Sequence, residues 1–135
     1  MPQFSVRSKK RLKQCDPRLQ KILNHAIKEV DFTILCGHRN EEDQNEAYRT
    51  GKSTKRWPQS KHNKKPSLAV DVAPWFGPQV KIDWDDLLAF ARLAGYFEAI
   101  ADHLGIRIRW GADWNENGRS RDERFIDAGH FELVD

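Results

Sequence analysis

The chain has 135 residues, of which 39% are hydrophobic, 10% aromatic and 32% charged, with a formal net charge of +3. This length corresponds to one ordinary domain that buries a core without disulfide staples. The composition excludes a disordered tail, and no apolar run approaches the roughly 20 residues that a membrane-spanning helix needs. We therefore expect a single domain over residues 1–135, without membrane insertion.

Charge is distributed unevenly along the chain. Residues 1–30 carry eight Lys and Arg against two Asp and Glu, and residues 49–65 carry seven against none. The rest of the chain is acidic, so we expect a basic face that attracts a polyanion, either a phosphorylated cell envelope or a nucleic acid. Cys15 and Cys36 lack the spacing of a redox or zinc-finger pair, and we expect buried thiols.

The first half of the chain predicts helices and strands joined by one long loop. Asp16-Pro17 is typical of a helix start, and an apolar stripe of helical period follows it. Residues 31–36, rich in β-branched and aromatic side chains, predict a strand. Asn40 and the three acidic residues after it predict a second helix. Residues 51–67 are basic and aperiodic, which indicates a functional or mobile loop.

The second half predicts a long helix and three short strands. Residues 68–73 form an apolar run interrupted by one carboxylate, which indicates a buried strand. Asp83 is a candidate cap for a long amphipathic helix that ends at Gly105. Residues 106–110 and 130–134 alternate in polarity, as half-buried antiparallel strands do. We therefore expect the α+β class, with a small, mainly antiparallel sheet flanked by helices.

Three side chains beside these strands could hold a catalytic metal. His62, Asp71 and His130 supply the two imidazoles and one carboxylate that a catalytic zinc uses when one position stays open for water. Asp71 interrupts an apolar strand, where an unpaired carboxylate would be costly. Asp127 precedes His130 by three residues and could act as a general base. Spacing alone leaves open that both histidines are merely hydrogen-bonded.

Five short motifs in this order identify a resemblance that covers nearly the whole chain. They are Gly37-His-Arg39, Ser60-Lys-His62, Ala69-Val-Asp71, Trp110-Gly-Ala-Asp-Trp114 and Asp127-Ala-Gly-His-Phe-Glu132. Together they resemble the zinc D-Ala-D-Ala carboxypeptidase family, and most closely its phage branch of L-alanyl-D-glutamate endopeptidases, which act as endolysins.

The resemblance implies a role for each matching residue. In that family the residues that match His62, Asp71 and His130 bind zinc, the residue that matches Asp127 is the catalytic base, and the one that matches Arg39 supports developing negative charge. An ion pair between Arg39 and the acidic residues that follow it remains the alternative. The family usually separates its first His and Asp by six residues with a Gly between them, whereas eight separate His62 from Asp71. We expect a longer turn that still lets the ligands converge.

Further binding residues are predicted in two loops. Ser60 and Trp57, in or beside the basic loop, are candidates for contacts with substrate. Asp113, Asn115 and Asn117 match the opening of a calcium loop, although Arg124 stands where a bidentate Glu would complete it. Calcium is therefore a second candidate ion, and the alternative is an Asx- and Gly-rich turn.

The leading hypothesis is a monomeric zinc peptidase that cleaves the peptide stem of bacterial peptidoglycan, between L-Ala and D-Glu. The alternatives are a D-Ala-D-Ala carboxypeptidase of the same family, a wall-binding homologue without catalysis, a nucleic-acid-binding module and a non-haem iron oxygenase. No recognisable nucleic-acid motif is present, and the oxygenase would need a larger β core. The N-terminal residues lack the apolar stretch of a secretory signal. We expect synthesis in the host cytoplasm, release through a separate pore-forming protein, and no separate wall-binding domain.

Overall fold

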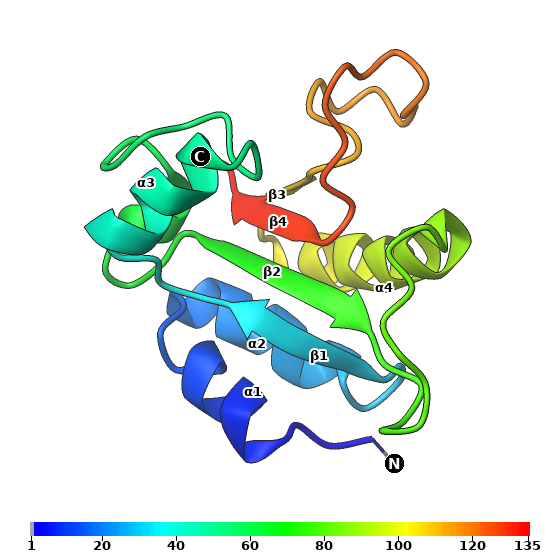
Figure 1. Ribbon diagram of the computed structural model, residues 1–135. Helices are drawn as coiled ribbons and strands as arrows, with labels where there is room; N and C mark the ends of the chain where they lie inside the picture. Colours follow the sequence, from blue (N-terminus) through cyan, green and yellow to red (C-terminus); the bar gives the residue numbers. More distant parts are fainter. Residues whose placement is uncertain (1) are drawn as a thin grey trace.

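Four antiparallel strands form one sheet in the order β1-β2-β4-β3 in the computed structural model, which describes residues 2–135 (Figure 1). The elements in chain order are α1 (Val6–Leu12), α2 (Pro17–Ala26), β1 (Phe32–Cys36), α3 (Glu41–Arg49), the 3-10 turn η1 (Lys61–Asn63), β2 (Ala69–Pro74), α4 (Leu87–Leu104), β3 (Ile108–Trp110) and β4 (His130–Leu133). The predicted α+β class with a small antiparallel sheet is confirmed.

Helices α2 and α4 cover one face of the sheet, while α3 and the long loops lie toward the other (Figure 1). The core forms on the helix-covered face, where alternate strand residues such as Val72 and Phe131 point. Phe97 of α4 packs edge-to-face on Phe131 and Phe32, at 4.8 and 5.0 Å between ring centroids. One face of the sheet therefore packs against the helices, and the other face is free to carry functional side chains.

Helix α1, which the sequence did not predict, covers the edge of β1. The Ser8 hydroxyl accepts a hydrogen bond from the Ile34 backbone N–H at 3.0 Å, and Arg11 donates to the Ile34 carbonyl at 2.9 Å. These contacts satisfy backbone groups that an edge strand would otherwise expose. Helix α1 has no long apolar stripe, and Ser8 and Leu12 are its buried residues.

The predicted start of α4 differs from the structure. The cap of α4 is Asp86, whose side chain accepts from the Ala89 N–H, and not Asp83. Asp83 instead accepts from the Asp85 N–H, which forms a turn before the helix. The helix ends as predicted at Gly105, whose φ of 72° is left-handed. No helix among the described residues is long and apolar enough to cross a membrane.

Candidate active site

The open face of the sheet carries polar side chains from three adjacent strands. Cys36 of β1 is opposite Asp71 of β2, and Asp71 is opposite His130 of β4. Directly paired residues in an antiparallel sheet point to the same face. The strand register alone therefore brings Asp71 and His130 together from positions far apart in the chain.

His62 reaches this row from η1. The Ser60 side chain caps this turn by accepting from the His62 N–H at 3.2 Å, and the Asn63 side chain accepts from the Ser60 N–H at 3.0 Å. The Leu68 N–H donates to the Lys61 carbonyl at 3.1 Å, which closes the long turn between His62 and β2. The turn thus absorbs the longer spacing, as expected from the sequence.

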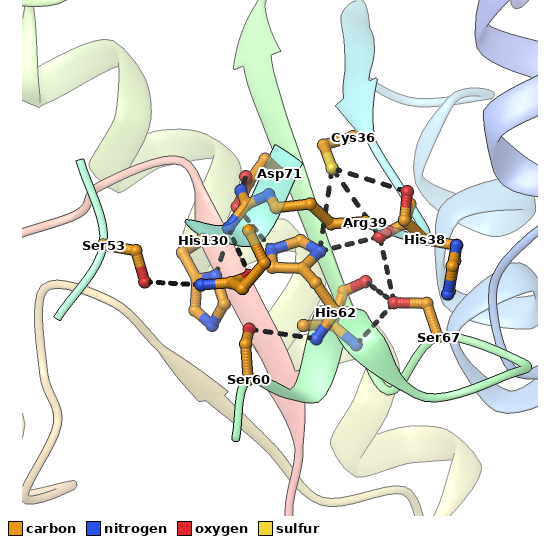
Figure 2. Close-up of polar contacts among 12 residues, drawn as sticks. Cys36, His38, Arg39, Ser53, Ser60, His62, Ser67, Asp71 and His130 are labelled. Carbon is orange, nitrogen blue, oxygen red and sulfur yellow. Dashed lines mark hydrogen bonds and ion pairs between the residues drawn. The ribbon is translucent and has the colours of Figure 1, made fainter. Parts of the chain in front are cut away.

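Both imidazoles converge on one oxygen of Asp71 (Figure 2). Nε2 of His62 lies 3.2 Å and Nδ1 of His130 lies 3.1 Å from Oδ1 of Asp71. The opposite nitrogen of each ring has its own acceptor: Nδ1 of His62 lies 2.7 Å from the Gly37 carbonyl, and Nε2 of His130 lies 2.9 Å from Glu132. These outer contacts orient each ring so that its inner nitrogen faces Asp71.

The donor set fits a divalent metal ion. Potential ligand atoms lie within 4.8 Å of one another in two overlapping groups, Cys36–His62–Asp71 and Asp71–Asp127–His130, which share Asp71. Cys36 was not assigned to the site from the sequence. Its Sγ lies 3.9 Å from Nδ1 of His62, and this nitrogen already contacts the Gly37 carbonyl. His62 and His130 fall in separate groups that share Asp71, and the side away from Cys36 offers the imidazole and carboxylate donors typical of a catalytic zinc.

The charges of this cluster are strongly coupled. Burial alone would lower the pKa of His62, but the Asp71 carboxylate outweighs it and raises that pKa to about 10. Burial would raise the pKa of Asp71, but the two imidazoles hold it well below its usual range. The pKa of His130 is also raised, because Asp71 and Glu132 outweigh its burial. Metal binding at these groups must therefore displace protons.

Asp127 stands beside the cluster on the segment before β4. Burial, followed by the negative charge of Asp71, raises the pKa of Asp127 above its usual range. A backbone turn fixes this position, since the Asp127 N–H donates to the Gly111 carbonyl at 2.7 Å and the His130 N–H donates to the Asp127 carbonyl at 3.0 Å. At Gly111 an added Cβ would lie 2.1 Å from the Asp127 carbonyl oxygen. This close approach explains a glycine in the Trp110-Gly-Ala-Asp-Trp114 motif.

Arg39 contacts the cluster and not the acidic residues that follow it in sequence. Its Nη2 donates to Oδ2 of Asp71 at 3.2 Å, and its Nη1 donates to Gln44 at 3.0 Å. Gln44 of α3 is fully buried and also donates to the hydroxyl of Ser53 and the carbonyl of Lys55. Gln44, which sequence analysis missed, therefore links Arg39 to the basic loop.

Glu132 extends the site along β4. Its side chain is 3% exposed and contacts His130 with one oxygen and Arg109 of β3 with the other, at 2.8 Å. Lys61 lies 3.5 Å from the same carboxylate. Burial would raise the pKa of Glu132, but His130 and Arg109 hold it at about 2. Glu132 and Arg109 were not identified from the sequence as functional residues.

Both imidazoles and Asp127 line a cleft of about 280 Å³ on the open face of the sheet, as do Arg39, Arg109 and Glu132, whereas Asp71 lies behind them and is not among the lining residues. Ser60 lines the cleft, whereas Trp57 is half-buried in its loop and is not among the lining residues. Aromatic surface is supplied by Trp114 and Phe125, and the Trp114 ring lies 5.4 Å from that of His130. A substrate contact by Trp57 stays a prediction.

The predicted calcium loop forms a turn closed by its own hydrogen bonds. The Asp113 carboxylate accepts from the backbone N–H groups of Asn117 and Gly118, at 3.1 and 2.8 Å. The side chains of Asn115 and Asn117 both donate to Asp122. All three predicted residues thus lie in one turn, in which the oxygens of Asp113 accept from the backbone.

The fold and the site together define an α+β peptidase. The family described as phage L-alanyl-D-glutamate peptidase matches residues 1–134. The L-alanyl-D-glutamate peptidase of Escherichia phage T5 is 38% identical over 136 residues, which cover 97% of each chain. The crystal structure of the Serratia marcescens L-Ala D-Glu endopeptidase ChiX superposes with a TM-score of 0.75 at 27% identity, covering 97% of this chain and 89% of the other.

This chain belongs to the phage L-alanyl-D-glutamate peptidase family. The resemblance inferred from the five motifs is confirmed, and the chain is an enzyme of the peptidase class.

Proposed function

We propose that this protein is a zinc endopeptidase that hydrolyses the bond between L-Ala and D-Glu in the peptide stem of bacterial peptidoglycan, as a phage endolysin. The observation that carries the proposal is the convergence of His62 and His130 on Asp71, with Asp127 beside them in a cleft. The phage T5 and Serratia relatives are named for cleavage between L-Ala and D-Glu, which supports the choice of bond.

His62 through Nε2, His130 through Nδ1 and Asp71 through its carboxylate would hold the zinc ion. Bound zinc supplies a Lewis acid that polarises the scissile carbonyl and makes water a better nucleophile. Asp127 accepts the proton of the attacking water and later delivers it to the amine of the departing D-Glu residue, so that each product keeps a stable protonation state. The raised pKa of Asp127 suits a group that must first take and then release a proton.

Arg39 is positioned to stabilise negative charge that develops on the substrate. Its guanidinium is held between Asp71 and Gln44 and lines the cleft. A donor fixed in this way stabilises negative charge on the carbonyl oxygen without having to reorganise during the reaction. The family resemblance assigns the same role to this residue.

The test combines metal analysis with mass spectrometry of digested peptidoglycan. Purified protein should contain about one equivalent of zinc, lose activity on chelation and regain it on addition of zinc. New amino-terminal D-Glu identifies the proposed bond. Released D-Ala would instead identify a carboxypeptidase, and intact stems in the presence of zinc would identify a non-catalytic wall-binding protein.

Peptidoglycan is the proposed partner, and the protein acts as a monomer that reaches the wall through a separate pore after synthesis in the host cytoplasm. Calcium binding by Asp113, Asn115 and Asn117 also stays a prediction. Calorimetric titration with calcium, with Asp113→Asn as the comparison, tests it directly.

A further inference from the structure

The cleft has a strongly cationic wall. Arg39, Lys52, Lys55, Lys61 and Arg109 all line it, against the carboxylates of Asp127 and Glu132. Because Arg39 is paired with Asp71, the remaining excess of positive charge lies with the basic loop and with β3. A cleft of this charge favours a substrate that carries a carboxylate close to the reacting bond.

Arg109 is a cation of this wall whose position is fixed by the sheet. It is opposite Glu132 in the β3–β4 ladder, and its Nη2 donates to Glu132 at 2.8 Å. Lys61 also faces this carboxylate, so two cations surround one anion and leave one positive charge in excess. The Nε of Arg109 has no acceptor among residues 2–135 but is buried and closed to a ligand. Only Nη2 is engaged by Glu132, so Nη1 remains available as a donor.

The position of Arg109 matches one part of the proposed substrate. Asp127, which delivers the proton to the departing amine, is bonded through its backbone to Gly111, two residues after Arg109. Arg39 approaches Asp71 from the opposite side, after β1. In the proposed reaction, the residue that receives its proton from Asp127 is therefore assigned to the β3 side of the cleft. A D-Glu residue that continues the stem through its side-chain carboxyl group keeps its α-carboxylate free, on the carbon that bears the amine.

We propose that Arg109 is the specificity-determining residue that binds this free α-carboxylate, so that the enzyme selects D-glutamyl stems over stems with an α-carboxamide. This inference rests on the proposed function. A planar guanidinium offers a carboxylate two parallel donors, and Glu132 holds it in place before the substrate arrives. A carboxamide presents an N–H group and no charge to the same donors.

Lys52 and Lys55 are weaker candidates for this role. Both side chains are exposed on the loop after α3, and they form no ion pair with any residue that the structure describes. A flexible lysine loses more conformational freedom on binding than a guanidinium that is already fixed. We assign to them the general attraction of an anionic wall.

The experiment compares two soluble substrates that differ at one group. Both are N-acylated L-Ala-D-Glu-L-Lys peptides joined through the D-Glu side-chain carboxyl, one with a free α-carboxylate and the other with an α-carboxamide. We expect the zinc-loaded wild-type enzyme to prefer the carboxylate by about 10- to 100-fold in kcat/KM, the range for hydrogen bonds to a charged group. In Arg109→Gln this preference should fall close to unity.

The ratio of kcat/KM for the two substrates distinguishes a loss of specificity from structural damage. A variant that merely disturbs Glu132 or the fold lowers kcat/KM for both substrates alike. Arg107→Gln is the matched control: Arg107 carries the same charge two residues earlier, outside the cleft and beside Glu116, and should keep the wild-type ratio. Lys52→Gln and Lys55→Gln should also keep it.

Three results would overturn the inference. A wild-type enzyme that cleaves both substrates equally shows that no carboxylate is selected, whether or not the variants fold. An unchanged preference in folded Arg109→Gln, or a preference lost in a lysine variant instead, removes the assignment to Arg109. The inference also fails if the wild-type enzyme digests peptidoglycan at L-Ala–D-Glu but cleaves neither soluble substrate. If the enzyme leaves peptidoglycan intact as well, the proposed function itself is refuted.

Discussion

Nε2 of His130 lies 2.9 Å from Oε1 of Glu132, on the side of the ring away from Asp71. The two residues are two positions apart on β4 and therefore share the open face of the sheet. An imidazole that donates through Nε2 keeps the lone pair of Nδ1 available for a metal ion. Arg109 and Lys61 hold Glu132 ionised, so the carboxylate remains a strong acceptor.

This contact predicts that Glu132→Gln weakens zinc binding by about 10- to 100-fold, the usual cost of losing such an outer partner. Competition with a chromogenic chelator measures the affinity directly. Glu116→Gln is the matched control, because Glu116 pairs with Arg107 at the surface, away from the cleft. Equal zinc affinity in the two variants would show that Glu132 does not orient His130.

Asp127→Ala should retain zinc and lose hydrolysis by about 100- to 10,000-fold, the contribution typical of a general base. The variant distinguishes a general base from a metal ligand. Asp127 could be either, because its carboxylate lies within 4.8 Å of potential ligand atoms of Asp71 and His130. Zinc content of the purified variant separates the two roles. Loss of zinc together with activity would make Asp127 a ligand, and wild-type lysis would exclude it as the base.

The metal-free protein should be most stable between about pH 4.5 and 6.5. Glu132 has its pKa lowered from 4.5 to about 2, so its contribution is present above pH 4.5 and is lost as the pH falls. His62 has its pKa raised from 6.5 to about 10, so its contribution is present below pH 6.5 and is lost as the pH rises. Each loss should amount to a few kcal/mol, at about 1.4 kcal/mol per unit of pKa.

Urea unfolding of the chelated protein across this pH range measures both limbs. In the zinc-loaded protein the alkaline limb should disappear, because a metal-bound imidazole is already neutral. A metal-free protein whose stability does not change between neutral pH and pH 10 would contradict the ionic cluster around Asp71.

Gly111→Ala and Gly95→Ala should have opposite effects. At Gly111 the new Cβ would collide with the Asp127 carbonyl oxygen, and at Gly95, inside α4, it would meet no atom within 4 Å. Gly111→Ala should therefore displace the segment that carries Asp127 and His130 and lower both activity and the melting temperature. Gly95→Ala should stabilise α4 by about 0.5–1 kcal/mol. Thermal unfolding with activity assays checks both, and a neutral Gly111→Ala would show that the close approach is not needed.

Local patterns in the sequence were sufficient for most of the secondary structure. The apolar stripe after Asp16-Pro17 became α2, and the β-branched run at 31–36 became β1. The sequence did not define the start of α4, because Asp83 and Asp86 can both cap a helix. Only the path of the chain into α4 makes Asp86 the cap. Helix α1 was missed because, apart from its Ser5 cap, it is short, has no long apolar stripe and makes its side-chain contacts with β1.

By itself the sequence determined the class of the protein, because five short motifs in a fixed order carry His62, Asp71, His130, Asp127 and Arg39. Which atoms meet was decided only by the tertiary structure. Strand register sets Asp71 against His130, and the same register sets Glu132 against Arg109. Gln44 and Cys36 reach the site from α3 and β1 with no motif that marks them. Such partners are invisible in a linear pattern because antiparallel pairing and burial join residues by their position in space.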